Sequence, residues 1–451
     1  MTHSTKRKSR KISRLLLATM SVLLPTLSAI ATLAILSPAC AKKPDATSSA
    51  SLPLPTDFPS EKPYFIRVPA QADWSKMNWI RRPPPAFELA HKWGPFFDLR
   101  QVDLSRLDLM DHAQDLLTSF FDTETKWPEE LPAGFDPGKI LDVNRNPSLG
   151  LRELHARGFT GKGVSVAVID MPFLLDHEEY ADRLRFYGEV NALGEANFHG
   201  TLVTSILAGR ACGVAPEAEI YYVGNRNYDI APKDGATVPN AAHIAKAIDA
   251  LLEANAQLPR EKRIRVISIS AAWGPKNPGF KAANKAVRKA AEAGIFVVSG
   301  NITVEHEPGF WFWGLDRAAS DSPDEPVAYR VLSWKDWISQ IAGRDGFEKF
   351  YEKRLKKAGS PEFLLISEGP RTVAHPFGRS AYGFYPMGGW SSILPYIAGL
   401  YALACQVKPE IAPEVFWRAA LATGDPMPVK TGWATYAGKR INPARLIESL
   451  R

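Results

Sequence analysis

Short apolar runs alternate with amphipathic stretches through the middle of the chain. The apolar runs have the length and the Val/Ile content of buried strands, and they lie at residues 164–170, 219–223, 265–270 and 295–299. Apolar residues with helical spacing occur between them, at residues 200–208, 241–256 and 281–293. Strands that alternate with helices predict a mostly parallel central sheet with helices on both faces. We therefore expect an α/β fold that binds ligands at the carboxyl ends of its strands, where Asp170 and Asn301 fall.

Residues 63–144 show a different pattern. An Asp-Leu pair recurs every five residues, at positions 98–99, 103–104 and 108–109. Three such units are too few for an independent solenoid, so we favour a polar turn followed by a helix near residues 111–120. The region also holds four tryptophans: Trp74, Trp79, Trp93 and Trp127. This aromatic content predicts that the region packs on the main domain, either as a removed prosegment or as a permanent N-terminal layer.

The N-terminus has the features of an export signal. Six basic residues and no acidic one accompany a long apolar run, Leu15–Leu36, which is followed by Ser37–Ala41. Three processing routes remain open: lipidation of Cys40, cleavage after Ala41, or an uncleaved anchor, since about 20 residues suffice to span a bilayer. Each route places the rest of the chain outside the cytoplasm, in a bacterial cell envelope or in secreted form.

The charge balance argues against a large basic surface. The formal net charge is +7, and six positive charges lie in the signal. The remainder is close to neutral, so we expect no nucleic-acid partner, and membrane contact only through the signal or a lipid anchor. Cys212 and Cys405 lie in apolar helical contexts; this compartment permits a disulfide, but buried free thiols are the favoured interpretation.

These patterns divide the chain into four parts. They are the signal (1–40), a flexible linker rich in Pro, Ser, Ala and Lys (41–62), the N-terminal extension (63–144) and the main domain (145–451). The main domain has a long insertion, residues 302–380, with an amphipathic stretch at Phe347–Lys357 and four tryptophans: Trp311, Trp313, Trp334 and Trp337. The sequence leaves open whether the insertion is a substrate lid, a partner surface or additional core.

A serine near the C-terminus lies where a nucleophile is expected. Ser391 stands between a glycine turn and an apolar helix, although a Gly-x-Ser sequence before a helix is also an ordinary N-cap. A serine becomes nucleophilic when a histidine takes its proton and a carboxylate orients that histidine. Asp170 at the end of the first strand and His199 at the start of a helix are the candidates for these roles. Ser392 is the alternative nucleophile, but the spacing to Pro395 favours Ser391.

Five segments resemble, in the correct order, motifs of the subtilisin-like serine peptidases. They are Gly161–Asp170, His199–Thr201, Gly213–Ala218, Ser391–Gly399 and Gly438–Asn442. Each motif alone is weak, but their ordered conjunction is specific. The order Asp, His, Ser is that of subtilisin among the convergent triads, whereas a lipase or esterase has the order Ser, acid, His.

The resemblance implies a subtilisin-like α/β domain with serine endopeptidase activity on polypeptide substrates. Within it, Asp170 orients the general base His199, and Ser391 forms the acyl-enzyme. Asn301 is implied as the side-chain donor to the oxyanion, a role that an amide N–H fits chemically.

The resemblance also bears on substrate binding and cofactors. The segment with Ser270 and Ala271 resembles the edge strand that pairs with an extended substrate. No cofactor is required for this chemistry, and a structural calcium ion is implied by the resemblance alone. His306 stands between two glutamates but lacks a second ligand pair, so a solvated loop is favoured over a metal site.

Three positions depart from the family pattern. Met171-Pro172 stands where the family has Ser/Thr-Gly, Trp390 replaces the threonine before the nucleophile, and Ala271-Ala272 replaces Leu-Gly in the substrate strand. The departures at Pro172 and Trp390 motivate an alternative hypothesis, a catalytically inactive binding or scaffold protein of the cell envelope on the same fold.

Overall fold

The computed structural model describes residues 54–73, 97–192, 194–231, 236–306, 309–333 and 352–451. The expected export signal with Cys40 and the first part of the linker lie outside these residues. Five tryptophans and the start of the amphipathic stretch also lie outside them: Trp74, Trp79, Trp93, Trp334, Trp337 and residues 347–351.

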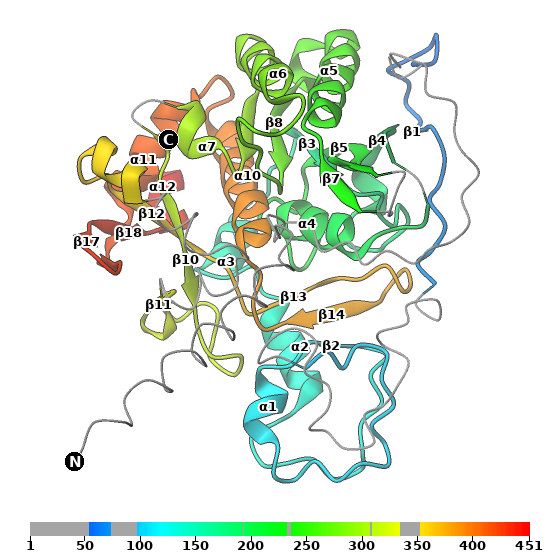
Figure 1. Ribbon diagram of the computed structural model, residues 1–451, viewed down its shortest axis with the longest axis vertical. Coiled ribbons are helices and arrows are strands. Elements are labelled where there is room, and N and C mark those ends of the chain that lie inside the picture. Colours follow the sequence, from blue (N-terminus) through cyan, green and yellow to red (C-terminus); the bar gives the residue numbers. More distant parts are fainter. Residues whose placement is uncertain (1–53, 74–96, 193, 232–235, 307–308, 334–351) are drawn as a thin grey trace, which may run out of the picture.

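A six-stranded parallel sheet forms the centre of the molecule, in the order β1-β4-β5-β3-β8-β9 (Figure 1). Its strands are β1 (Tyr64–Phe65), β3 (Ser165–Asp170), β4 (Leu184–Val190), β5 (Glu219–Asn225), β8 (Ile264–Ile269) and β9 (Phe296–Ser299). Every residue of β3 is buried, because helices cover both faces of the sheet. The α/β fold with a parallel sheet, expected from the alternating pattern, is confirmed.

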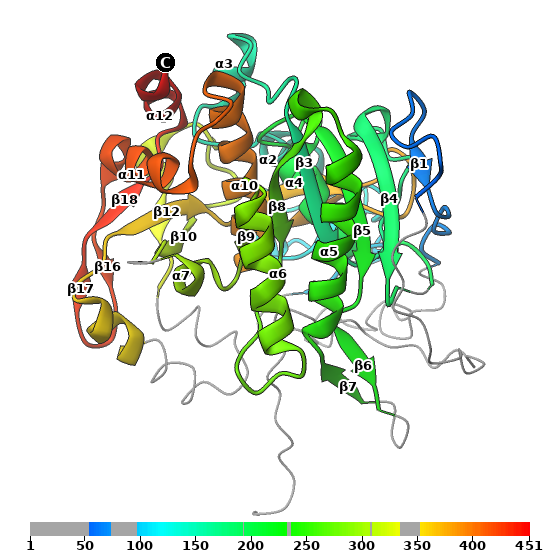
Figure 2. The ribbon, with the colours of Figure 1, turned by 90° about the horizontal axis from the view of Figure 1, so that it is seen from above.

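Two pairs of helices cover the two faces of this sheet (Figure 2). α4 (Phe198–Ala208) and α10 (Trp390–Val407) lie on one face, and α5 (Ala242–Gln257) and α6 (Phe280–Glu292) lie on the other. Successive side chains of β3 point to opposite faces. Val166 and Val168 therefore pack with α4 and α10, whereas Ala167 and Ile169 pack with α5 and α6.

The helix α10 is the central helix of the core. Among the described residues it is a helix long and apolar enough to cross a membrane, but 78% of that window is buried inside the fold. Gly399 permits its close packing, since a Cβ there would lie 2.5 Å from the Cβ of Val214. Cys405 on α10 is a buried free thiol, as is Cys212.

A second, five-stranded sheet lies beside α10, in the order β11-β10-β12-β18-β15. Its strands are β10 (Phe312–Asp316), β11 (Arg330–Val331), β12 (Phe363–Ser367), β15 (Asp425–Pro426) and β18 (Gly438–Arg440). Trp311 and Trp313 are only 3% and 1% exposed, so the described part of the insertion contributes to the core. The remaining elements of the main domain are α3 (Leu151–Ala156), β6 (Tyr228–Ile230), β7 (Thr237–Pro239), α7 (Ile302–Glu305), α11 (Pro413–Thr423), β16 (Val429–Lys430), β17 (Thr435–Tyr436), α12 (Pro443–Leu450) and the 3-10 turns Ala181–Arg183, Arg260–Lys262 and Pro326–Ala328.

The five-residue repeat is part of a single loop, residues 97–127, in which the chain turns once and returns alongside itself. In each unit the aspartate accepts a hydrogen bond from the backbone N–H two residues later, as in an Asx turn, and the leucine is fully buried. Parallel bridges join Asp98 to Phe120 and Asp103 to Lys126, so the chain returns along itself after one circuit. The short helix α1 (Ala113–Leu117) lies within that circuit, followed by β2 (Phe121–Asp122) and α2 (Pro137–Asn144).

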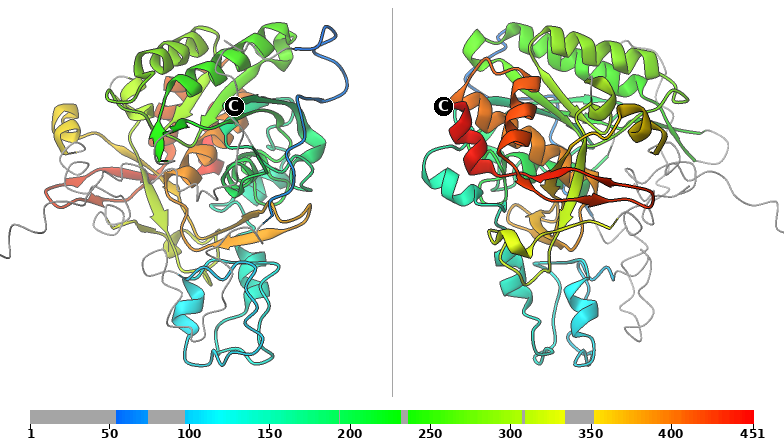
Figure 3. Two further views of the ribbon diagram at one scale, coloured as in Figure 1. Left: turned by 45° about the vertical axis from the view of Figure 1, so that its right-hand side comes forward. Right: turned by 90° about the vertical axis from the view of Figure 1, so that its left-hand side faces the viewer.

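This N-terminal layer, residues 97–144, is joined to the main domain by a shared sheet. β2 pairs antiparallel with β14 (Tyr382–Tyr385), which in turn pairs with β13 (Arg371–Ala374), beneath the main sheet (Figure 3). Arg100 is buried, donates to the Tyr385 hydroxyl at 2.7 Å and forms an ion pair with Asp98. Its guanidinium carbon lies 5.5 Å from the ring centre of Phe198, the residue before His199.

The described start of the chain also lies on the main domain. The Phe58 ring is 5.8 Å from that of Phe186 on β4, and Arg67 forms an ion pair with Glu189 at 2.6 Å. The end of the expected linker therefore packs along the edge of the central sheet.

We expect residues 97–144 to remain in the mature protein, because their removal would expose Phe384 and leave β14 without its partner strand. Mass spectrometry of the mature protein should give an N-terminus upstream of residue 97. A version starting at residue 145 should aggregate or lose cooperative unfolding, while one starting at residue 54 unfolds cooperatively. A stable mature protein that begins near residue 145 would contradict this prediction.

Candidate active site

Three side chains converge at the carboxyl end of β3. Asp170 is the last residue of β3, His199 is the second residue of α4, and Ser391 is the second residue of α10. The first turns of both helices approach the end of the strand. Residues far apart in sequence thereby meet, as the general geometry of parallel sheets predicts.

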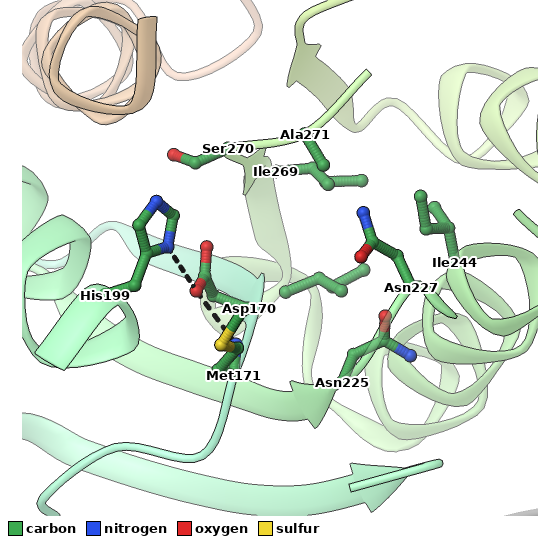
Figure 4. A pocket seen from close by; sticks show the side chains of 10 residues that line it. Asp170, Met171, His199, Asn225, Asn227, Ile244, Ile269, Ser270 and Ala271 are labelled. Atoms are coloured by element: carbon green, nitrogen blue, oxygen red, sulfur yellow. Dashed lines mark hydrogen bonds and ion pairs between the residues drawn. The ribbon is translucent and has the colours of Figure 1, made fainter. Parts of the chain in front are cut away.

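The three side chains form a continuous hydrogen-bonded chain. His199 Nδ1 lies 2.7 Å from Asp170 Oδ1, and His199 Nε2 lies 2.9 Å from Ser391 Oγ. Figure 4 shows His199 directed toward Asp170. An ionised carboxylate only accepts, so Nδ1 donates to Asp170 and Nε2 accepts from the serine hydroxyl. Ser392, the alternative nucleophile, is buried on the side of Gly388.

The pKa of His199 reflects two opposing effects. Burial of the ring lowers it, but the charge of Asp170 and the hydrogen bond to its carboxylate raise it, and the net pKa is above its ordinary value. The carboxylate therefore makes the imidazole a stronger base than burial alone would allow.

The unusual Met171-Pro172 turn is held by backbone contacts. Asp170 Oδ1 accepts from the Met171 N–H at 2.8 Å, Tyr222 donates to the Met171 carbonyl, and the Pro172 carbonyl accepts from Asn197 N–H at 2.6 Å. The turn passes so close to α4 that a Cβ on Gly200 would lie 2.3 Å from the Met171 carbonyl oxygen. The residue after His199 must therefore be glycine.

Asn301 follows β9 and precedes the short helix α7. Its side chain is held against Trp273: Nδ2 donates to the Trp273 carbonyl at 2.9 Å, and Oδ1 lies 3.4 Å from the Trp273 N–H. An amide nitrogen carries two hydrogens, and no contact in the described part of the chain uses the second.

Ser270 and Ala271 lie beside the triad, immediately after β8. The Ser270 hydroxyl donates to the Ser391 carbonyl at 3.2 Å, so it supports the first turn of α10. Both backbone groups of Ala271 are already bonded, N–H to the Ile269 carbonyl and C=O to the Gly300 N–H, each at 2.8 Å. The contact from Ser270 to Ser391 was not foreseen from sequence.

A small pocket, with a cavity volume of about 20 Å³, opens next to Asp170 and His199 (Figure 4). It is walled by apolar and amide side chains: Ile169, Met171, Asn225, Asn227, Ile244, Ile269, Ser270 and Ala271. Asn225 Nδ2 donates to two backbone carbonyls outside the pocket, of Val190 and His243.

Metal ligands do not cluster in the part of the chain that the structure describes, where no group of three or more His, Cys, Asp and Glu is arranged to hold an ion. His306 lies 3.3 Å from Glu414, and its ring stacks on Phe310 with centroids 4.2 Å apart. A structural calcium ion stays an expectation that rests on the resemblance alone.

One buried acid near the triad escaped the sequence analysis. Glu368 follows β12, is 2% exposed, and accepts the N–H of Gly389 at 2.7 Å. The signal was a charged residue at the end of an apolar strand, in Leu364-Leu365-Ile366-Ser367-Glu368, which the motif comparison did not cover.

Two comparisons with known proteins gave matches, one to a family and one to a solved structure. The model of the subtilase family matches residues 161–339, which contain Asp170, His199 and Asn301 but not Ser391. A solved structure described as the prenylagaramide maturation protease PagA is 18% identical; the alignment has a TM-score of 0.44 and covers 67% of this chain and 98% of that one. Ser391 is therefore linked to the matched segment by its contact with His199.

The buried carboxyl of Glu368 makes stability depend on pH. Burial raises its pKa from 4.5 to about 7, so the folded protein keeps a proton that the unfolded chain has lost. Its contribution to the free energy of unfolding should fall as pH rises from about 4.5 to about 7, by at most about 3 kcal/mol. Glu368→Gln cannot ionise, so urea unfolding at pH 5 and pH 8 should show the variant gaining stability over wild type at the higher pH. If the difference in stability between Glu368→Gln and wild type were the same at pH 5 and pH 8, the prediction would be wrong.

Proposed function

We propose that this chain, whose residues 161–339 belong to the subtilase family, is a serine endopeptidase that cleaves peptide bonds through an acyl-enzyme on Ser391. The observation that carries the proposal is the chain of contacts from Asp170 through His199 to Ser391, at 2.7 and 2.9 Å. These lengths allow proton transfer from the serine to the histidine without rearrangement.

The proposed reaction begins when Ser391 Oγ attacks the substrate carbonyl carbon and His199 Nε2 takes the hydroxyl proton. Asp170 holds the tautomer with Nδ1–H and stabilises the imidazolium that forms. His199 then gives the proton to the leaving amine, which departs as the acyl-enzyme forms. Water, activated by the same histidine, releases the acyl group and restores Ser391.

The negative charge on the carbonyl oxygen needs donors in the transition state. Asn301 Nδ2 is the proposed side-chain donor, and the Ser391 backbone N–H at the start of α10 is the proposed second one. The bond from Nδ2 to the Trp273 carbonyl supports this role, because it fixes the amide before substrate arrives.

Polypeptides are the proposed substrates. Ser270 and Ala271, which line the pocket beside Asp170 and His199, are the proposed substrate-binding residues. Nucleic acid is not a proposed partner. We further propose that the protein is exported, to the cell envelope through a lipid on Cys40 or into the medium, with membrane contact through the N-terminal segment alone.

An inactive binding or scaffold protein on the same fold is the second candidate. Trp390 favours it, because this large ring stands directly before Ser391 and packs on Phe312, with centroids 5.1 Å apart. The intact contacts of His199 favour the enzyme.

A fluorophosphonate probe distinguishes the two candidates. Wild type should be labelled on Ser391 and should hydrolyse labelled casein, because the probe reacts only with an activated serine. Ser391→Ala should lose both properties, while Ser392→Ala retains the labelling. A wild-type protein that is not labelled, or an equally labelled Ser391→Ala variant, would reject the enzyme.

The acid limb of activity should follow the titration of His199, which must be neutral to accept the serine proton. Because its pKa is raised, the midpoint of the fall in casein hydrolysis should lie above pH 6.5. Asp170→Asn should shift the midpoint to lower pH, since burial remains while the raising charge is gone. It should also reduce the rate by about 10⁴-fold, because the tautomer is no longer fixed. An unchanged acid limb in Asp170→Asn would exclude His199 as the titrating base.

A further inference from the structure

The carboxylate of Glu368 lies in an unusual environment. The residue is 2% exposed and directly follows β12, all five residues of which are buried. Its Oε1 accepts the Gly389 N–H at 2.7 Å, and its Oε2 is buried with no hydrogen-bond partner among the described residues. Burying a carboxylate costs stability when one of its oxygens has no hydrogen-bond partner. We therefore asked what the contact between Glu368 and Gly389 contributes.

Two glycines allow close packing around Glu368, Gly314 against its carboxyl group and Gly388 against its backbone carbonyl. A Cβ on Gly314 of β10 would lie 2.4 Å from Glu368 Oε2. A Cβ on Gly388 would lie 2.5 Å from the Glu368 carbonyl oxygen and 2.0 Å from Ser392 Oγ. Strand β10 and the turn before α10 therefore close around Glu368, and the side chain has little freedom to move.

The bond from Gly389 to Glu368 fixes the backbone that presents Ser391. Gly389 is the N-cap residue of α10 and has a φ of +64°. As a glycine it has no side chain that could cap the helix. A carboxylate at a helix start accepts an otherwise unpaired N–H and interacts favourably with the positive end of the helix dipole. One residue after Ser391, the Ser392 N–H donates back to the Gly389 carbonyl at 3.0 Å, which closes the turn.

Charged groups around Glu368 come from both neighbouring elements. Burial raises its pKa to about 7, the Gly389 hydrogen bond lowers it, Asp316 on β10 raises it, and Arg371 on β13 lowers it. The Gly389 N–H needs only an acceptor oxygen, which a carboxylate, a carboxylic acid and an amide all provide. The contact does not depend on the charge.

We infer that Glu368 is a positioning residue for the nucleophile: it anchors Gly389 and thereby holds Ser391 Oγ within reach of His199 Nε2. The inference rests on the proposed function, in which Ser391 is the nucleophile. The path consists of two contacts joined by a short stretch of backbone: Glu368 Oε1 accepts from the Gly389 N–H at 2.7 Å, the chain continues to Ser391, and Ser391 Oγ lies 2.9 Å from His199 Nε2.

The test measures the maximal labelling rate and the half-saturating concentration of a fluorophosphonate probe on the full chain. Glu368→Ala removes the acceptor, and Glu368→Asp keeps the charge but is one methylene too short to reach Gly389. Both should lower the maximal labelling rate by about 10²-fold with little change in half-saturation, because a displacement of about 1 Å misaligns the nucleophile. Glu368→Gln should restore most of the rate, because its amide oxygen accepts the same bond.

Asp122→Ala is the matched control. Asp122 is 1% exposed and accepts a backbone N–H from Gln101, but it lies in the N-terminal layer. Its loss should lower the melting temperature without changing the maximal labelling rate. A Glu368→Asp protein that is labelled at the wild-type rate would overturn the inference, as would a Glu368→Gln protein as slow as Glu368→Ala.

Hydrogen exchange separates failure of this inference from failure of the proposed function. If Glu368→Ala does not fold, the other two variants still test the contact, because Glu368→Asp loses the hydrogen bond to Gly389 and Glu368→Gln keeps it. Exchange of the Gly389 amide should be faster in Glu368→Asp than in wild type and near the wild-type rate in Glu368→Gln. Equal exchange in all three would overturn the anchoring role. A wild-type protein that exchanges as expected but is never labelled would reject the proposed function, and with it the role of Glu368 in positioning a nucleophile.

Discussion

The approach of two helix N-termini to the end of one buried strand is the constraint on which the site depends. Asp170 ends β3, and the first turns of α4 and α10 bring His199 and Ser391 to it. At the start of α4 this close approach requires a residue without a Cβ, which explains Gly200 beside the Met171 carbonyl; farther along α10, Gly399 permits close packing against Val214. Asp170, His199 and Ser391 therefore meet through regular strand and helix positions and not through a loop.

Much of the surrounding structure stabilises that approach. The Met171-Pro172 turn is bonded to Tyr222 and Asn197, and the Ser391 carbonyl accepts from Ser270. The N-terminal layer reaches the same region through Arg100, whose guanidinium lies over the ring of Phe198 beside His199. Tertiary contacts therefore hold the unusual Met171-Pro172 turn in place.

The alternating pattern predicted the parallel sheet well, because buried parallel strands produce apolar runs whatever their neighbours are. It did not predict the loop of residues 97–127. Leu99, Leu104 and Leu109 recur at a spacing that fits neither a helix nor a strand, and parallel bridges to residues 120 and 126 close the loop. Glu368 was missed for a related reason: its partner, Gly389, lies 21 positions away, and no local pattern marks a backbone N–H as the target of an acid.

The sequence alone predicted Asp170, His199 and Ser391 as a triad, since strand ends and helix starts leave local signals, and the family resemblance added Asn301 to the predicted site. Only the tertiary structure decided which groups surround them. Asn301 is bonded to Trp273, Trp390 packs on Phe312, and Glu368 lies beneath the nucleophile turn. These contacts join residues from different elements, and their distances follow from how sheets and helices pack rather than from spacing along the chain.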